Sequence, residues 1–217
     1  AYARGPRTLV ADMQAIRPTI MAGVPKVYDP LAKRVRERVP GWLAWPLRAG
    51  LLSWPLNRRV LGGRMRLMVS GGGALSEETH AFLRGAFRGV DVVQGYGLTE
   101  TCGGGTLQPA GDAQVGVIGR ASACNEVRLA SDPETGYLVQ DRVGRGGLPV
   151  LGRGEVLIRG DNVAAGYFKR DGFPLDADGW FHTGDIAQLE PDGRTYRIVD
   201  RKKNLVKTRR GEYVALE

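Results

Sequence analysis

The first half of the chain carries apolar residues in patterns typical of helices and of extended strands in turn. Helical spacing predicts helices over residues 8–16 and 25–39, the second with a proline at its first position. Apolar runs predict a buried strand over 18–24 and further strands over 64–70 and 90–94. Ser76, followed by Glu77 and Glu78, predicts a capped helix that reaches about Phe87. Strand, glycine loop, helix and strand in succession predict a βαβ unit with a parallel sheet.

Beyond about Val115 the pattern changes to short runs of alternating polarity. These runs cover residues 126–130, 155–160, 185–189 and 195–199, and turn clusters such as Pro191-Asp192-Gly193 separate them. Alternation of this kind predicts antiparallel strands. We therefore expect an α/β fold in three parts: an α/β layer over 1–114, a β-rich subdomain over 115–199, and a hinge with the start of a small domain over 200–217.

The positive charge of the chain is concentrated in one segment. The net charge is +8, and the stretch from Lys33 to Arg66, with nine basic residues and one acidic residue, carries a net +8 by itself. Tryptophans and leucines between the arginines of residues 34–59 suggest a peripheral membrane surface or an acidic partner. An ordinary helical segment with a solvated basic face explains the same pattern. Basic charge without a recognisable binding module gives no reason to expect nucleic acid as a partner.

Cysteine and histidine are scarce, and no long apolar run is present. Two cysteines without a CxxC pair fit a reducing compartment, and two scattered histidines give no metal cluster. The sequence contains no stretch of about 18 uncharged apolar residues, so it predicts no membrane-spanning helix. We therefore expect a cytoplasmic protein, with residues 34–59 as a candidate peripheral membrane surface.

The stretch from Gln94 to Thr101 presents the groups of a nucleotide site. Gly95 and Gly97 flank Tyr96 directly after a predicted strand, and these glycines allow a close approach of the backbone to a ligand. Tyr96 offers a flat face for a base, Thr99 a donor for a phosphate oxygen, and Glu100 a hard oxygen ligand for Mg²⁺. Read alone, the stretch is equally typical of a tight turn with a polar rim.

Two later stretches also carry chemistry. Asp185 follows Gly184 at the start of a predicted strand, where a fixed carboxylate can accept both hydroxyls of a ribose. Taken alone, the same aspartate is an ordinary turn residue. The run from Asp200 to Lys207 contains four basic residues, a pattern that solvated charge runs also show.

Together these stretches resemble, in order and spacing, the acyl-adenylate-forming enzymes. The motifs are Ser70-Gly71-Gly72-Gly73-Ala74-Leu75, Gln94 to Glu100, Gly166-Tyr167-Phe168-Lys169, Trp180 to Asp185 and Asp200-Arg201-Lys202-Lys203. The resemblance covers residues 8–217. Within that family the chain is most similar to the long-chain fatty acyl-CoA synthetases, on residues 17–25, 95–103, 200–207 and 211–214.

The resemblance implies ATP or AMP, Mg²⁺, CoA and a fatty acid as ligands, and it implies a role for each motif residue. Gly71, Gly72 and Gly73 with Tyr96 would hold the adenine, within a nucleotide-binding set that includes Gln94, Gly95, Gly97 and Thr99. Thr99 would contact the α-phosphate and Glu100 would bind Mg²⁺. Asp185 and Arg201 would hold the ribose hydroxyls. Lys203 would be the interdomain hinge, Lys207 would lie near the reacting groups, and Tyr213 would stack on the CoA adenine.

The reaction implied is activation of a long-chain fatty acid to an acyl adenylate, followed by transfer to CoA. The family's Ser/Thr/Gly-rich phosphate loop ending in Pro-Lys has no counterpart here, nor has its small C-terminal domain with a late catalytic lysine. We therefore expect a central fragment of an enzyme that is inactive alone. Two other interpretations stay open: a fatty acyl-AMP ligase that delivers to a carrier protein, and a nucleotide- or membrane-binding module without catalysis.

Overall fold

The computed structural model describes residues 5, 8–38, 53–207 and 213–214. The chain forms two compact units: Ala1–Gln94 with Pro109–Gly116, and Gly95–Gln108 with Val117–Glu217. Part of the basic segment of residues 34–59, residues 39–52, lies outside the described residues, so its proposed membrane role stays a prediction. Within the described part of the chain, no helix is both long enough and apolar enough to cross a bilayer.

The first unit is built on parallel strands. β1 (Ile20–Gly23) pairs with β2 (Leu67–Ser70), and β2 pairs with β3 (Asp91–Tyr96), which confirms the βαβ prediction. Ser70 lies opposite Gln94 in the register. The glycine segments that follow these two residues therefore begin at the same, carboxyl-terminal edge of the sheet, where parallel α/β sheets bind their ligands.

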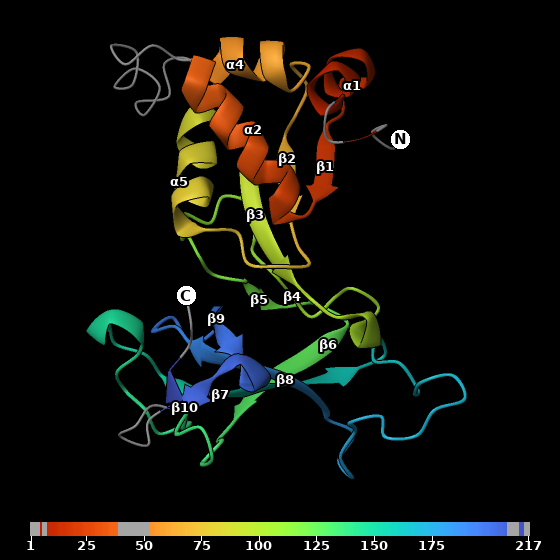
Figure 1. Ribbon diagram of the computed structural model, residues 1–217, viewed down its shortest axis with the longest axis vertical. Coiled ribbons are helices and arrows are strands. Elements are labelled where there is room, and N and C mark those ends of the chain that lie inside the picture. The colour runs from red at the N-terminus through yellow and green to blue at the C-terminus, as the bar shows by residue number, and fades with distance from the viewer. Residues whose placement is uncertain (1–4, 6–7, 39–52, 208–212, 215–217) are drawn as a thin grey trace. The chain divides into compact units, whose positions relative to one another are not determined.

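Four described helices accompany this sheet (Figure 1): α1 (Leu9–Ile16), α2 (Pro25–Arg38), α4 (Ser53–Val60) and α5 (Glu77–Ala86). α2 and α5 run side by side. The start of α5 is the capped start that the sequence predicts, because the Ser76 hydroxyl accepts a hydrogen bond from the Thr79 amide at 3.1 Å.

The core of the first unit is closed by large side chains from every one of these elements. Its fully buried members include Tyr28, Leu61, Met68, Leu83 and Phe87. The Tyr28 hydroxyl lies 2.9 Å from the carbonyl oxygen of Val69, so a polar atom from α2 is satisfied on β2.

The strand predicted over 18–24 is present as β1, but the prediction that it is buried is wrong. Its residues alternate between exposed and half-buried, and Ile20 is 62% exposed. Among the described strands β1 pairs on one side only, with β2. An apolar run on such an edge strand reads in the sequence like a run from the middle of a sheet.

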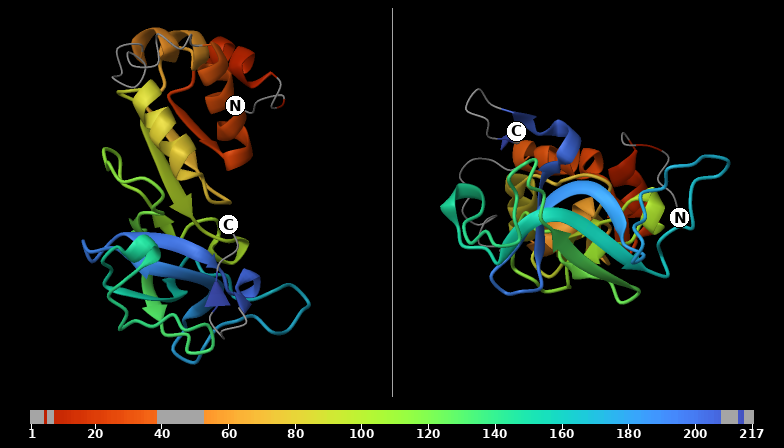
Figure 2. Two further views of the ribbon diagram at one scale, coloured as in Figure 1. Left: turned by 60° about the vertical axis from the view of Figure 1, so that its left-hand side comes forward. Right: turned by 90° about the horizontal axis from the view of Figure 1, so that it is seen from below.

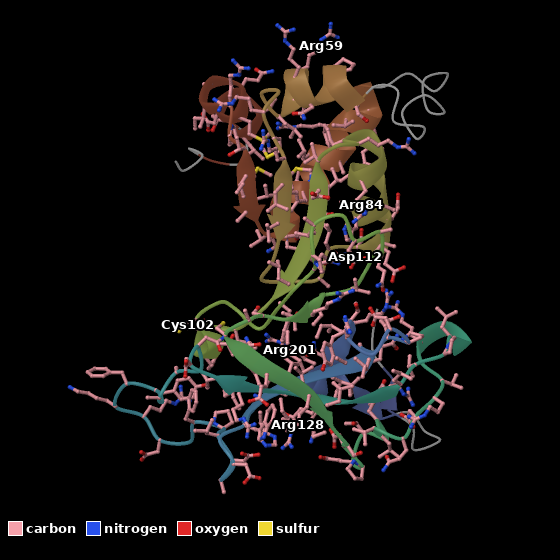
Figure 3. All side chains as sticks on the ribbon, turned by 180° about the vertical axis from the view of Figure 1, so that it is seen from behind. Arg59, Arg84, Cys102, Asp112, Arg128 and Arg201 are labelled. Carbon is pink, nitrogen blue, oxygen red and sulfur yellow. The ribbon has the colours of Figure 1, made fainter. Side chains whose placement is uncertain are left out.

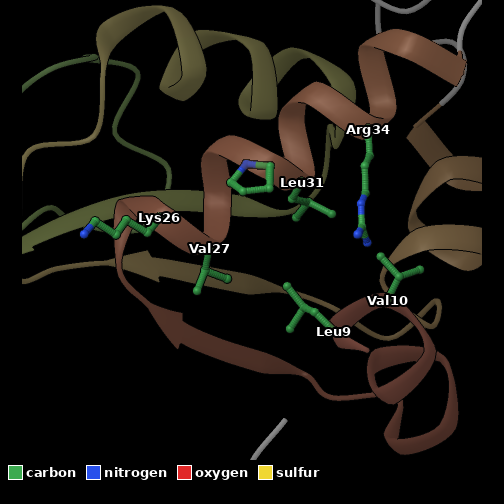
Figure 4. Close-up of a pocket in the computed structure, with 7 residues that line it drawn as sticks. Leu9, Val10, Lys26, Val27, Leu31 and Arg34 are labelled. Carbon is green, nitrogen blue, oxygen red and sulfur yellow. The ribbon is translucent and has the colours of Figure 1, made fainter. Parts of the chain in front are cut away.

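A shallow pocket lies between α1 and α2 in the first unit (Figure 4). Leu9 and Val10 of α1 face Val27 and Leu31 of α2, and Arg34 also lines it. None of the residues predicted to bind nucleotide lines this pocket.

The second unit is the antiparallel part of the chain. β3 continues into it, and Gly95 and Tyr96 pair with Leu107 and Thr106 of β4 (Thr106–Leu107), which pairs in turn with β5 (Arg120–Ala121). A separate curved sheet (Figure 2) has the order β6 (Asn125–Ala130), β7 (Gly152–Gly160), β8 (Phe181–Leu189) and β9 (Tyr196–Arg201). Its strands are antiparallel, as the alternating pattern predicts. A short hairpin of β10 (Val206–Lys207) and β11 (Tyr213–Val214) follows.

As well as the chain from Val117 onward, the second unit includes residues 95–108. Those residues pair with β5 and pack on the antiparallel sheet, so the glycine-tyrosine-glycine motif belongs structurally to the β-rich unit.

Candidate functional site

Asp185 lies inside β8, in an irregular stretch of the strand. The sequence predicts it at the start of a strand, but β8 begins earlier, at Phe181. The pairing with β7 shifts register between Glu155 and Leu157, so residues 183–185 form a bulge, and Gly184 has a φ of 71°. A bulge re-aims the side chains that it carries, and Asp185 is one of them.

Side chains satisfy the backbone groups that this bulge frees. Glu155 Oε1 accepts a hydrogen bond from the Gly184 amide at 2.9 Å. The Thr183 hydroxyl donates to the Val156 carbonyl at 2.8 Å and lies 3.1 Å from the Asp185 amide. Because the Gly184 and Asp185 amides both have side-chain partners, Glu155 and Thr183 help to fix the geometry of the bulge.

A histidine lies between two carboxylates beside the bulge. His182 Nδ1 is 3.3 Å from Glu155 Oε2 and its Nε2 is 3.6 Å from Asp176 Oδ2. Asp176 in turn accepts hydrogen bonds from the Trp180 and Asp178 amides, and the Trp180 bond is the main reason why its pKa is lowered. His182 therefore links the strand that carries Asp185 to Glu155 and to Asp176.

The Asp185 carboxylate is buried, at 5% exposure, and holds two polar partners. The Tyr96 hydroxyl donates to Oδ2 at 2.7 Å, and Arg201 Nε lies 3.3 Å from Oδ1. Burial raises the pKa of Asp185, while the bonds from Tyr96 and Arg201 act in the opposite direction. The structure thus brings together three of the residues predicted to bind the nucleotide.

Tyr96 joins the aromatic position of the glycine motif to this carboxylate. Its side chain packs against the cluster of Val156, Ile158 and Ala187, and its hydroxyl is fixed by Asp185. Burial, and next the charge of Asp185, raise the pKa of Tyr96. The phenol therefore stays protonated and can only donate toward Asp185, which gives the ring one fixed orientation.

Arg201 is the third member and is the most exposed one. It ends β9, its side chain is 67% exposed, and it is labelled in Figure 3. An ion pair with so much solvent contact contributes little to stability. Its guanidinium can move to meet a ligand at small energetic cost.

The glycine motif continues into a short 3-10 helix, η2 (Thr99–Thr101), that carries Thr99 and Glu100. The buried Thr101 hydroxyl lies 3.0 Å from the Leu98 amide and closes this turn. A Cβ on Gly97 would collide with the carbonyl oxygen of Gly103, so this close approach needs glycine.

Residues 162–167 form hydrogen bonds to the same turn. The Asn162 side-chain amide donates to the Thr101 carbonyl at 3.0 Å and to the Gly104 carbonyl. The Ala164 amide donates to the Glu100 carbonyl at 2.8 Å, and the Tyr167 hydroxyl donates to Glu100 Oε1 at 2.7 Å. This last bond raises the pKa of Tyr167 and aims one oxygen of Glu100.

Glu100 is suited to bind a cation whose other ligands come from the substrate. Among the described residues no group of three His, Cys, Asp or Glu side chains is placed to hold a metal by itself. Mg²⁺ is commonly bound through one or two carboxylates plus substrate phosphates, and a half-exposed carboxylate next to the Thr99 hydroxyl fits that donor set.

The other glycine segment, Gly71 to Gly73, belongs to the first unit. Gly72 has a φ of 72°, and the three residues are exposed or half-exposed. The loop ends at Leu75, whose buried amide donates to Gln94 Oε1 at 2.9 Å. Gln94, predicted to bind nucleotide, is 3% exposed and uses its amide inside the protein, so its predicted contact with the ligand gains no direct support from its side chain.

The hinge residues follow β9. Lys203 is exposed in the 3-10 helix η4 (Lys202–Asn204), between Lys202, which pairs with Asp132 at 3.1 Å, and the buried Leu205. Lys207 and Tyr213 lie in β10 and β11, and their side chains are outside what the structure describes. The roles of all three residues stay predictions.

Sequence reasoning misses three residues that shape these sites: Glu155, Tyr167 in its contact with Glu100, and His80, which adjoins Gln94. Gly166-Tyr167 is part of a family motif, so the sequence points to Tyr167 but not to its contact with Glu100. Glu155 and His80 carry no such signal, because their partners are distant in sequence.

The family model of the AMP-binding enzymes matches residues 1–168. Long chain acyl-CoA synthetase 1 of Arabidopsis thaliana is 38% identical over 95% of this chain and 34% of its own length. Fatty acyl-CoA synthetase A of Dictyostelium discoideum is 37% identical over 96% of this chain and 34% of its own. The chain thus spans about a third of the length of these curated relatives.

Solved structures give the same result. The A domain of a carboxylic acid reductase from Segniliparus rugosus, in complex with AMP and a co-purified carboxylic acid, matches with a TM-score of 0.71 at 28% identity, over 96% of this chain and 31% of that one. ATP-bound MatB from Rhodopseudomonas palustris matches with a TM-score of 0.68 at 27% identity, over 97% of this chain and 36% of that one. The chain therefore belongs to the AMP-binding enzyme family.

Proposed function

We propose that the chain supplies the nucleotide-binding part of an AMP-forming long-chain fatty acid–CoA ligase. The observation that carries the proposal is the joining of Tyr96, Asp185 and Arg201 in one hydrogen-bonded group. The names of relatives at 33–38% identity support the long-chain acyl substrate and the CoA acceptor.

The proposed reaction has two steps. An oxygen of the fatty acid carboxylate attacks the α-phosphorus of ATP, and the bond to pyrophosphate breaks, which leaves an acyl adenylate. The thiolate of CoA then attacks the acyl carbonyl, and AMP departs with the electron pair of the acyl–phosphate bond. The first step turns a poor acyl donor into a mixed anhydride, and the second uses that activation to form a thioester.

The residues of this chain bind and orient the nucleotide in both steps. Asp185 is an acceptor-only group and takes hydrogen bonds from both ribose hydroxyls, with Arg201 as the adjacent donor. Tyr96 contacts the adenine, and the family resemblance implies an adenine contact for Gly71 to Gly73 as well. The Thr99 hydroxyl donates to an α-phosphate oxygen, where negative charge builds up as the carboxylate attacks.

Glu100 is the residue that would hold Mg²⁺, with the Tyr167 hydroxyl keeping its carboxylate in place. The bound cation would neutralise charge on the phosphate oxygens.

Lys203 and Lys207 are proposed to serve the change between the two steps. The thioester step needs different groups around the same carbonyl, and rotation of a small domain about Lys203 would bring them there. Lys207, four residues beyond, would then move relative to the nucleotide, as would Tyr213, proposed to stack on the CoA adenine.

A second acceptor is favoured by one structural likeness. The A-PCP didomain of the carboxylic acid reductase from Segniliparus rugosus, in complex with AMP, matches with a TM-score of 0.72 over all of this chain and 28% of that one. Delivery of the acyl group to a carrier protein in place of CoA is therefore the alternative, and it uses the same first step.

The test is calorimetric titration of the chain with a non-hydrolysable fatty acyl-adenylate analogue, beside Tyr96→Ala and Asp185→Ala. We expect saturable binding that both changes weaken, and no acyl-CoA from the chain with ATP, fatty acid and CoA. Binding that neither change affects would contradict the proposed site. Acyl-CoA formation by these 217 residues alone would contradict the expectation that catalysis needs further parts of the kind present in the longer relatives.

A further inference from the structure

His80 is a fully buried histidine in α5, in the first unit, that the proposed chemistry does not use. Its Nε2 lies 2.9 Å from the Val92 carbonyl oxygen. Its Nδ1 lies 3.5 Å from the side-chain nitrogen of Gln94 and 3.4 Å from the Gly116 amide nitrogen. The ring therefore bridges α5, β3 and the segment 109–116.

Only one arrangement of protons satisfies all of these contacts. The Leu75 amide is a donor, so the oxygen of the Gln94 amide faces it and the nitrogen faces His80. Nδ1 must then accept from Gln94 and Gly116, and Nε2 must carry the proton that it donates to the Val92 carbonyl. The neutral Nε2–H tautomer is thus the form that this network requires.

The network ends at the glycine loop. Gln94 holds Leu75, the residue that closes the loop of residues 71–74, through its oxygen, and His80 holds the nitrogen end of the same amide. Without an acceptor at Nδ1, the Gln94 nitrogen would lose its contact with His80. The Gln94 side chain would then be held less firmly against the Leu75 amide.

We propose that His80, as its neutral Nε2–H tautomer, is a positioning residue that holds Gln94 and Leu75 and so fixes the glycine loop for the adenine. This inference rests on the proposed function, because that proposal gives the loop its ligand. It also gives Gln94 a role different from the one predicted: the side chain supports the loop from inside.

The charged groups around His80 maintain the neutral form. Burial is the main cause of its lowered pKa, and Arg84 of α5 acts in the same direction. Asp112 on the segment 109–116 and Glu77 at the start of α5 act the other way. Arg84 and Asp112 are both labelled in Figure 3, and Arg84 also donates to the Val92 carbonyl at 3.3 Å.

Two variants of similar size separate the acceptor from mere space filling. In His80→Asn the side-chain oxygen can occupy the place of Nδ1 and accept from Gln94, whereas His80→Leu offers no polar atom. We expect His80→Asn to keep AMP affinity and Leu75 amide exchange within about threefold of the parent chain. A lost buried hydrogen bond of about 1–1.5 kcal/mol corresponds to about 5- to 10-fold, and we expect His80→Leu to weaken AMP binding and speed Leu75 exchange by that factor.

The variants are compared with the parent chain by calorimetry with AMP and by hydrogen exchange of the Leu75 amide. In addition, ¹⁵N NMR of the parent chain reports the protonation of the His80 ring. The expected imidazole spectrum has an unprotonated Nδ1 at pH 7, with a pKa below that of an ordinary histidine. A protonated Nδ1 at pH 7, or equal effects of the two substitutions on both readouts, would overturn the inference. If the parent chain binds no AMP, the proposed function fails, and Leu75 exchange with the imidazole spectrum still decides the role of His80.

Discussion

Replacing Asp185 by asparagine separates the function of this carboxylate from its effect on folding. The side chain is 5% exposed, and burial raises its pKa above the ordinary value of 3.8. A carboxyl group whose folded pKa is raised favours folding most below its unfolded pKa. That advantage is lost as the pH rises through the folded pKa, so the ionised Asp185 weakens the fold at neutral pH.

Asparagine keeps the useful internal contact and removes the charge. Its oxygen can still accept from the Tyr96 hydroxyl, and Arg201, 67% exposed, loses a pair that contributes little. We therefore expect the free energy of unfolding of Asp185→Asn at pH 7 to equal or exceed that of the parent chain. Relative to the parent, the variant should gain stability as the pH rises from 4 to 7.

Nucleotide binding should respond in the opposite way. Hydrogen bonds to a charged group contribute about 1.5–3 kcal/mol, so loss of the carboxylate toward the ribose should weaken binding of the acyl-adenylate analogue by about 10- to 100-fold. Calorimetry measures the affinity, and chemical denaturation followed by tryptophan fluorescence measures the stability.

Asp141→Asn is the matched control in the same unit. Asp141 is paired with Arg153 at 2.7 Å and accepts from the Leu138 amide, but it belongs to no predicted site. This change should cost about 1 kcal/mol of stability and leave the affinity unchanged. Unaltered affinity in Asp185→Asn, or a loss of stability as large as its loss of binding energy, would refute the reasoning.

Three further changes test neighbouring parts of the structure. Tyr167→Phe removes the hydroxyl that aims Glu100, and it should weaken the Mg²⁺ dependence of ATP binding by about 5- to 10-fold with AMP binding unchanged; equal effects on both nucleotides would count against it. Ser76→Ala removes the cap of α5 and should cost about 1 kcal/mol of unfolding free energy in a denaturant titration, and no loss would mean that the cap is not needed. Gly97→Ala places a methyl group against the Gly103 carbonyl and should lower the melting temperature sharply; an unchanged melting curve would show that this turn can yield.

The parallel and antiparallel layers could be predicted from the sequence because their signals are local. The cap at Ser76 with Glu77 and Glu78 fixes the start of α5, and alternating polarity marks β6 to β9. The exposure of β1 could not be predicted, since an apolar run reads the same on an edge strand as in the centre of a sheet.

The main residues of the candidate site could be predicted from the sequence, but the contacts that position them could not. The resemblance to the acyl-adenylate-forming enzymes led to Tyr96, Asp185 and Arg201, and the structure joins them. The bulge that re-aims Asp185 depends on Glu155, about thirty residues earlier, which pairs with it only once β7 and β8 are side by side. The engagement of Gln94 with His80 arises the same way, because a helix packs its buried face against a strand.

We propose that this chain recognises the ribose of an adenylate through Asp185 and Arg201. The most direct measurement compares the affinity of the parent chain for the non-hydrolysable acyl-adenylate analogue with its affinity for the 2′,3′-dideoxy form of the same compound. The account predicts that the dideoxy form binds at least about 10-fold more weakly, and that Asp185→Asn removes most of this difference. Equal affinity of the parent chain for the two compounds would contradict it.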